Sequence, residues 1–264
     1  MGQTITQVDA FTSERFRGNP AAICILEHEA QTEWMQRLAN EMNLSETAYV
    51  VPRGGSFGLR WFTPAVEVKL CGHATVAAAH VLWEEGFVPA GAECRFETLS
   101  GRLTARRTKG WIDVEFPREE VSESAIPDAA ERALAVKAIR AAESPRLSYL
   151  VLELESERAV IAAAPDYALA AKLAHQGLIV TSRAAGSDCD FVSRFFAPRM
   201  GVNEDPATGS AHCVLGPYWE RALGRSELRA RQLSPRGAEI RVKLDETRVT
   251  LGGQAVTVMR GELV

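Results

Sequence analysis

One residue pattern occurs twice in this chain at a fixed offset, and this repetition constrains the fold more than any other feature. The pattern F-x-x-R-x-F-x-P begins at Phe57 and again at Phe191, so every position is displaced by 134 residues. A glycine-containing turn follows each copy: Cys71-Gly72-His73-Ala74 in the first and Thr208-Gly209-Ser210-Ala211 in the second. The repetition predicts a duplicated unit, in which each turn opens a helix and the two turns face one another.

The predicted elements follow a similar order in both halves. Strands are expected over Thr47–Val51 and Phe57–Phe62 in the first half, and over Leu178–Thr181 and Phe191–Phe196 in the second. The helix predicted over Gly72–Glu85 is apolar on nearly every side, a pattern typical of a helix that is buried all round. A strongly curved sheet wrapped about one central helix in each half explains this pattern.

Three further expectations concern the second half of the chain. The polar stretch 117–127 is the expected domain boundary, and an added helix is expected over Asp128–Ala142. A strand is expected over Ala159–Ala164. Pro217 lies within the helix predicted after Gly209, and because proline lacks a backbone N–H it is expected to kink or shorten that helix.

Composition excludes several classes of function. A formal net charge of −4 over 264 residues, without a block of Lys and Arg, argues against binding to nucleic acid or to a membrane surface. The five cysteines are an odd number without a CxxC pair, and no spacing of histidines or carboxylates is typical of a metal site. The first ten residues lack the layout of a signal peptide. We therefore expect a reduced, cytoplasmic protein.

Several separated segments resemble the signature segments of the PhzF-like family, which is named for a phenazine-biosynthesis isomerase. They are Asn43-Leu44-Ser45-Glu46-Thr47-Ala48, Cys71-Gly72-His73-Ala74-Thr75, Asp205-Pro206-Ala207-Thr208-Gly209-Ser210-Ala211 and the N-terminal turn Gly18-Asn19-Pro20-Ala21-Ala22. The resemblance runs from about residue 5 to the C-terminus, with the segments in the same order as in the family.

The resemblance implies an α+β fold of the diaminopimelate-epimerase type. Two pseudo-symmetric domains are expected, each a strongly curved, barrel-like mixed β-sheet wrapped around a central helix. The first spans residues 1–117 and is completed by the C-terminal strand at about 256–264, and the second spans 118–255. The resemblance also implies an active site in the cleft between the domains, no metal or organic cofactor, and a homodimer.

Three residues fall on catalytic positions of the family. Glu46 matches its acid/base, although a lone glutamate before a strand is otherwise typical of a solvated carboxylate. His73 matches a histidine that positions or polarises the substrate, and a helix N-terminus favours its neutral form. Asp205 matches an aspartate in the cleft, for which we expect a positioning or proton-relay role, although an aspartate before proline is also common in turns.

The glycine turns are candidates for binding an anion. Gly72 and Gly209 allow a ligand to approach the backbone, and the first N–H groups of each helix are donors without a partner inside the helix. Ser210 adds a hydroxyl group, and Ser45 and Asn19 are weaker candidates at the rim. The expected partner is a small carboxylate-bearing metabolite, whose place sulfate or phosphate can take.

The residues before the two glycines separate two mechanisms. Epimerases that share this fold use two opposed cysteines, but here Cys71 is matched by Thr208, whose hydroxyl is a poor base for a carbon-bound proton. Cys71 is then expected to be a packed, unreactive thiol. We therefore predict a cofactor-independent isomerase that moves a proton through Glu46. The alternatives are an amino-acid epimerase or racemase of the same fold, and a non-catalytic binding or scaffold protein that retains it.

Overall fold

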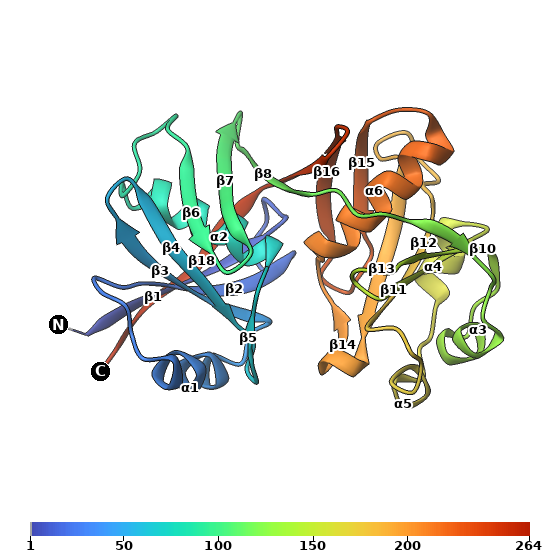
Figure 1. Ribbon diagram of the computed structural model, residues 1–264, viewed down its shortest axis with the longest axis horizontal. Coiled ribbons are helices and arrows are strands. Elements are labelled where there is room, and N and C mark those ends of the chain that lie inside the picture. The colour runs from blue at the N-terminus through green and yellow to red at the C-terminus, as the bar shows by residue number, and fades with distance from the viewer. Residues whose placement is uncertain (1) are drawn as a thin grey trace. The chain divides into compact units, whose positions relative to one another are not determined.

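The computed structural model describes residues 2–264, which divide by their mutual contacts into two compact units. Unit 1 comprises residues 2–116 and Leu251–Val264, and unit 2 comprises Pro117–Thr250. Both consist of strands around a few helices (Figure 1). The chain therefore leaves the first unit, builds the second and returns, with the return at residue 251, five residues before the expected position.

Unit 1 is built on a mixed sheet. Its strands are β1 (Gln3–Ala10), β2 (Asn19–Ile25), β3 (Glu46–Arg53), β4 (Ser56–Phe62), β5 (Glu67–Val68), β6 (Cys94–Thr98), β7 (Gly101–Thr108), β8 (Trp111–Pro117) and β18 (Ala255–Leu263). The pairs β2–β3 and β4–β6 are parallel, whereas β1–β2, β3–β4, β4–β5, β6–β7 and β7–β8 are antiparallel. The C-terminal strand β18 pairs antiparallel with β1, as the resemblance implies.

Unit 2 has the same alternation of parallel and antiparallel pairs. Its strands are β9 (Ser122–Ser124), β10 (Ala138–Ser144), β11 (Tyr149–Leu154), β12 (Gly177–Arg183), β13 (Phe191–Ala197), β14 (Val202–Asp205), β15 (Glu227–Gln232) and β16 (Ala238–Leu244), and β17 (Arg248–Gly253) runs across the boundary. The pairs β11–β12 and β13–β15 are parallel, and β12–β13, β13–β14 and β15–β16 are antiparallel. They correspond in order to β2–β3, β4–β6, β3–β4, β4–β5 and β6–β7.

One long helix is buried in each unit. Helix α2 (Gly72–Glu84) is buried at every residue from His73 to Trp83 and packs against β1, β2, β3, β7 and β18, so its apolar pattern is confirmed as that of an enclosed helix. Helix α6 (Gly209–Leu223) packs against β15 and β16. It has 15 residues against 13 in α2, so of the two effects expected of Pro217, a kink or a shortening, the shortening was wrong. The preceding Gly216 lacks the Cβ that would clash with the proline ring.

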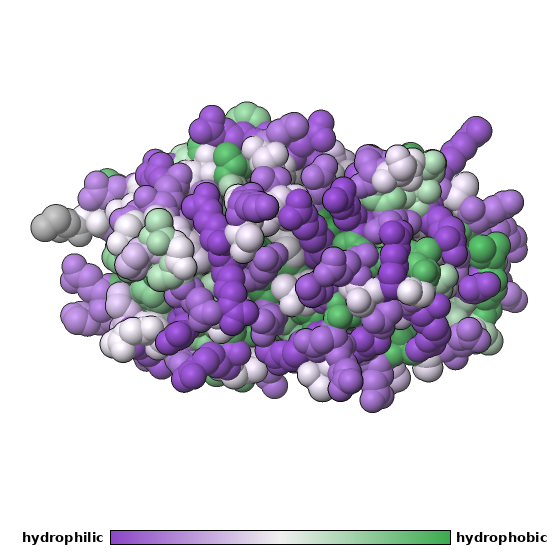
Figure 2. All heavy atoms as spheres, turned by 90° about the horizontal axis from the view of Figure 1, so that it is seen from above, coloured by the Kyte–Doolittle hydropathy of each residue, from purple (hydrophilic) through white to green (hydrophobic). Residues whose placement is uncertain are grey.

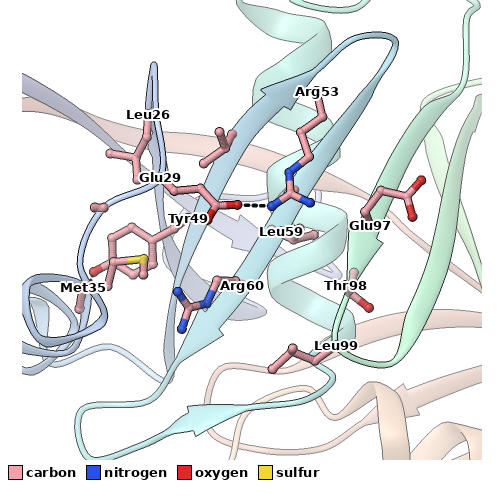
Figure 3. A pocket seen from close by; sticks show the side chains of 13 residues that line it. Leu26, Glu29, Met35, Tyr49, Arg53, Leu59, Arg60, Glu97, Thr98 and Leu99 are labelled. Atoms are coloured by element: carbon pink, nitrogen blue, oxygen red, sulfur yellow. Dashed lines mark hydrogen bonds and ion pairs between the residues drawn. The ribbon is translucent and has the colours of Figure 1, made fainter.

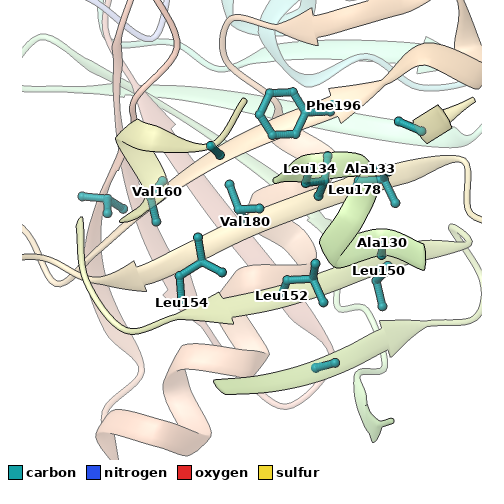
Figure 4. Close-up of a cluster of buried hydrophobic side chains, with 14 of the residues drawn as sticks. Ala130, Ala133, Leu134, Leu150, Leu152, Leu154, Val160, Leu178, Val180 and Phe196 are labelled. Carbon is teal, nitrogen blue, oxygen red and sulfur yellow. The ribbon is translucent and has the colours of Figure 1, made fainter. Parts of the chain in front are cut away.

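The remaining helices lie nearer the surface. Helix α1 (Thr32–Met42) precedes β3 in unit 1. Unit 2 contains α3 (Asp128–Leu134), α4 (Glu157–Ala162), α5 (Tyr167–Ala170) and the 3₁₀ turn η1 (Pro198–Met200). Side chains of α3 and α4, including Leu134 and Val160, pack over Leu152, Val180 and Phe196 of the sheet (Figure 4).

Of the predicted elements of unit 2, one helix was correct only in its first half and one strand was wrong. The helix expected over Asp128–Ala142 ends at Leu134, where Ala135 adopts a left-handed φ of 51°, and the chain continues as β10. Pairing of β10 with both β9 and β11 outweighs the intrinsic helical preference of its alanines. The strand expected over Ala159–Ala164 is helix α4, because Ser156 caps it by accepting the N–H of Ala159 at 3.3 Å.

The surface is mainly hydrophilic on the face shown in Figure 2, with smaller hydrophobic patches between the polar side chains. Within residues 2–264, no helix combines the length and the apolar character needed to cross a membrane.

Candidate active site

Glu46 is the first residue of β3, and the local sequence explains its placement. Helix α1 ends at Asn43, whose φ of 49° is left-handed, and its N–H bonds to the carbonyl oxygen of Ala39. Asparagine tolerates this conformation better than most residues, so it ends the helix and turns the chain into the strand. Parallel pairing with β2 sets Glu46 opposite Ala21. The carboxylate is 17% exposed, and the half-buried Ser45 precedes it.

His73, in the first turn of α2, lies directly beside this carboxylate. Its Nε2 is 3.2 Å from Oε2 of Glu46, although the two groups are not aligned for a hydrogen bond. On the other side of the ring, Nδ1 is 3.2 Å from Nδ2 of Asn19, the fully buried first residue of β2. Asn19 was expected at the rim of the site, but it instead lies behind the imidazole. The three side chains form a continuous polar row.

The imidazole of this row is neutral. Complete burial lowers the pKa of His73 to about 3, because the surroundings cannot solvate an imidazolium. The contact with Glu46 is therefore one between a neutral ring and a carboxylate, not an ion pair. With the Asn19 amide donating to Nδ1, the ring proton is on Nε2 and faces Glu46.

Cys71 is the third side chain at this place. It is the N-cap residue of α2, it is 7% exposed, and its Sγ lies 3.5 Å from Nδ1 of His73. The thiol is packed, as expected, and it is also in contact with the imidazole. Glu46, Cys71 and His73 therefore form one cluster in unit 1.

The turn before α6 in unit 2 is held by a different set of groups. The hydroxyl of Thr208 donates to Oδ2 of Asp205, the last residue of β14. Gln232, fully buried at the end of β15, accepts the Thr208 N–H at 2.8 Å and donates to the Asp205 carbonyl oxygen at 2.6 Å. Sequence reasoning missed Gln232, because a lone glutamine at a strand end carries no distinguishing pattern.

Ser210 is likewise held by a residue that the sequence did not indicate. Its Oγ lies 3.0 Å from the hydroxyl oxygen of Tyr149, the first residue of β11, which is buried. Gly209 precedes Ser210 and is buried as the first residue of α6. Asp205, Gly209 and Ser210 therefore lie together at one helix start.

Both helix starts retain the donors expected of an anion site. The N-cap residues Cys71 and Thr208 make no side-chain hydrogen bond to the first turn of their helices, as far as the described chain shows. The first N–H groups after Gly72 and Gly209 are therefore not satisfied by these caps, and such groups favour an oxyanion.

A cavity of about 330 Å³ lies elsewhere on unit 1, on the sheet near α1 (Figure 3). Met35, Tyr49 and Leu59 form its apolar part, and an Arg53–Glu29 ion pair crosses it. Within the described range, none of the predicted site residues is among those that line it. It is therefore separate from the Glu46–Cys71–His73 cluster.

Comparison with known proteins places the chain in a family. The family described as "Phenazine biosynthesis-like protein" matches residues 8–261, and the chain belongs to it. An uncharacterized isomerase of Halalkalibacterium halodurans is 46% identical and covers 100% of this chain and 99% of the relative. An uncharacterized isomerase of Pseudomonas aeruginosa is 48% identical, with 97% of each chain covered.

Solved structures confirm the fold. A PhzF-family protein of Enterococcus faecalis superimposes with a TM-score of 0.94 at 40% identity, with both chains covered completely. A hydroxyproline epimerase of Agrobacterium vitis shares the fold with a TM-score of 0.66 at 12% identity, covering 99% of this chain and 92% of the epimerase. The predicted family and fold class are confirmed, and the predicted isomerase class agrees with the names of these relatives.

Proposed function

We propose that the protein is a PhzF-family isomerase in which Glu46 moves a proton between two carbon atoms of a small carboxylate-bearing substrate. The row Asn19–His73–Glu46 is the observation that supports this proposal. A partly buried carboxylate beside a neutral imidazole can accept a proton and keep it from solvent. In the first step Glu46 takes the proton of a carbon–hydrogen bond, and in the second it delivers this proton to another carbon of the same conjugated system.

His73 supports both steps without changing its own charge. With the proton on Nε2, the ring can donate a hydrogen bond to the Glu46 carboxylate or to a substrate oxygen after a small rotation. Asn19 holds the ring by its other nitrogen. Since the pKa of about 3 leaves His73 neutral, it acts as a hydrogen-bond donor and not as the proton carrier.

The substrate carboxylate is assigned to the helix starts. The N–H groups that follow Gly72 and Gly209, together with the hydroxyl of Ser210, are donors suited to an oxyanion, and sulfate or phosphate can take its place. Asp205 is assigned a positioning role, because it accepts the Thr208 hydroxyl. The cleft and the homodimer expected from the family stay predictions, the latter to be checked by sedimentation.

Racemisation by two cysteines is the second candidate, and one contact argues against it. Thr208 occupies the place of the second cysteine, and its hydroxyl is engaged as a donor to Asp205. It is neither acidic nor oriented as a base. A purely binding protein would retain the helix starts but would not need Glu46.

Exchange of solvent hydrogen tests the proton carrier. Candidate carboxylate metabolites are incubated in deuterated water with the wild type, with Glu46→Gln and with Glu33→Gln, an exposed carboxylate on α1 that serves as the matched control. We expect label in the product with the wild type and the control, and a loss of about 100-fold or more with Glu46→Gln. Equal exchange by Glu46→Gln and the wild type would overturn the assignment.

A further inference from the structure

The cluster of Glu46, Cys71 and His73 has the donor set of a metal site, and we propose that it binds a zinc ion. One donor atom from each side chain can be chosen so that all three lie within 4.8 Å of one another. The Nε2 and Oε2 atoms are already 3.2 Å apart, whereas Sγ contacts the other ring nitrogen, Nδ1, at 3.5 Å. Donor atoms around tetrahedral zinc are about 3.3–3.6 Å apart, so a shift of the Cys71 side chain by at most about 1.5 Å brings its Sγ to the distance that zinc ligands require.

The ring nitrogen that binds the metal follows from the contacts of His73. Nδ1 is already in contact with Asn19, whereas Nε2 is buried and has no hydrogen-bond partner among the described residues. A buried nitrogen without a partner carries an energetic cost that a metal ion would remove. Nε2 is therefore the ligand, and the ring proton moves to Nδ1.

Asn19 is suited to this second tautomer as well. A half-turn of its side-chain amide exchanges the oxygen and nitrogen positions, so that the oxygen accepts the Nδ1 proton. Metal-bound histidines almost always donate their other ring N–H in this way, and the partner fixes the orientation of the ring. Asn19 can therefore hold the imidazole of His73 both in the tautomer used for proton transfer and in the tautomer that binds a metal ion.

The chemistry of the donors selects zinc over the harder cations. A thiolate, an imidazole and one carboxylate suit zinc and cobalt, whereas magnesium and calcium prefer oxygen ligands only. The thiolate of Cys71 and the carboxylate of Glu46 together balance the two positive charges of the ion. Three protein ligands leave a fourth position for water. None of the five cysteines, all of which lie within the described range, is in a disulfide, so no disulfide prevents Cys71 from acting as a ligand.

Zinc at this place would inhibit the isomerase, and this consequence alone rests on the proposed function. The metal would occupy the Glu46 oxygen that is meant to receive the substrate proton. A chelator should then restore the exchange activity. Sequence spacing did not indicate the site, because Glu46 comes from another segment than Cys71 and His73.

Titration with metal alone tests the site. Chelator-treated protein is titrated with zinc chloride by calorimetry, and with cobalt chloride while the thiolate-to-cobalt absorption is recorded. We expect one ion per chain, with cobalt absorption present in the wild type. Cys71→Ser should abolish that absorption and weaken zinc binding about 100-fold or more, and His73→Gln should weaken it similarly. The control Cys94→Ser changes another buried cysteine of unit 1 and should bind as the wild type does.

Two results would overturn the proposal: no zinc binding by the wild type at micromolar concentrations, or zinc binding by Cys71→Ser that equals that of the wild type. Circular dichroism of each variant shows whether it is folded. His73→Gln removes a second ligand, so a loss of zinc binding in this variant tests the site independently of Cys71→Ser. Because the titrations contain no substrate, a failure of the Glu46 assignment leaves their outcome unchanged.

Discussion

The same strand position carries a carboxylate in unit 1 and a glycine in unit 2. Phe62 of β4 pairs with Thr47, and its repeat Phe196 of β13 pairs with Leu178, so Glu46 corresponds to Gly177. A Cβ added at Gly177 would lie 2.6 Å from the ring of Phe195 and 2.7 Å from Tyr149. Unit 2 therefore has no room for a second glutamate at this position. The duplication produced two similar folds, but only one of them can carry the proposed base.

The starts of helices α2 and α6 also differ in the side chains that they carry, and again the groups that can act as bases are in unit 1. Cys71 and His73 of α2 correspond to Thr208 and Ser210 of α6, so a thiol and an imidazole are replaced by two hydroxyls. Hydroxyl groups donate hydrogen bonds to an anion but are poor bases at neutral pH. Under the proposed function, proton transfer is assigned to unit 1, and the hydroxyl groups of unit 2 are assigned to hydrogen bonding with the substrate.

What the two units share is an arginine–glutamate pair that joins two strands. Arg60 binds Glu67 by two contacts of 2.7 Å, and Arg194 binds Glu204 at 2.7 and 2.9 Å. Each guanidinium also lies over the phenylalanine two residues further along its strand. The repeated pattern in the sequence is therefore a structural element of the hairpins β4–β5 and β13–β14.

The largest effect on stability is expected from breaking the pair in unit 2. The side chains of Arg194 and Glu204 are each 11% exposed, and Arg194 also donates to the carbonyl of Ala163 at 2.8 Å. Arg194→Met leaves a buried carboxylate without its partner, so we expect a loss of about 3–5 kcal/mol. The matched change Arg60→Met, at 32% exposure, should cost about 1 kcal/mol. Urea unfolding measures both, and equal losses would contradict the comparison.

A smaller loss of stability is expected when the pH is lowered. It arises from buried histidines, of which His73 in unit 1 and His212 in unit 2 are a comparable pair. Burial lowers the pKa of His212 from its ordinary value of 6.5 to about 4, as burial lowers that of His73. Below pH 6.5 His212 becomes protonated in the unfolded chain but stays neutral in the folded chain until the pH approaches 4. The contribution of His212 to the free energy of unfolding is therefore fully present above pH 6.5 and decreases as the pH falls towards 4. Below pH 4 it decreases no further.

The variant His212→Gln isolates this contribution. Unfolding free energies of the wild type should fall by on the order of 3 kcal/mol more than those of the variant between pH 6.5 and 4. The variant also loses the contact of 2.8 Å with the Thr208 carbonyl oxygen, which lowers its stability at every pH without changing the slope. Parallel pH curves for the two proteins would show that His212 is not the source of the acid loss.

The sequence predicted the parts of the molecule that depend on local pattern. The burial of α2 followed from its apolar residues, and β4 and β13 followed from the repeat. The helix expected over Asp128–Ala142 was predicted correctly only as far as Leu134, because pairing with β9 and β11 decides the conformation of the residues from Ala138 onwards. Glu46 and His73 were identified through the resemblance, whereas Tyr149 and Gln232 contact the start of α6 from strands that are distant in sequence, and no local pattern encodes such contacts.

Removing the Tyr149 hydroxyl should have the smallest effect, and it separates binding from catalysis. Tyr149→Phe leaves the packing against Phe195 in place but removes the partner of Ser210, 3.0 Å away. A neutral hydrogen bond contributes about 0.5–1.5 kcal/mol, so we expect the KM for a carboxylate substrate to rise about 2- to 10-fold with kcat nearly unchanged. In Ser210→Ala the tyrosine change should add little further, since both variants remove the same contact. A fall in kcat with an unchanged KM would instead place the hydroxyl of unit 2 in the proton transfer itself, and the division between the two units would then fail.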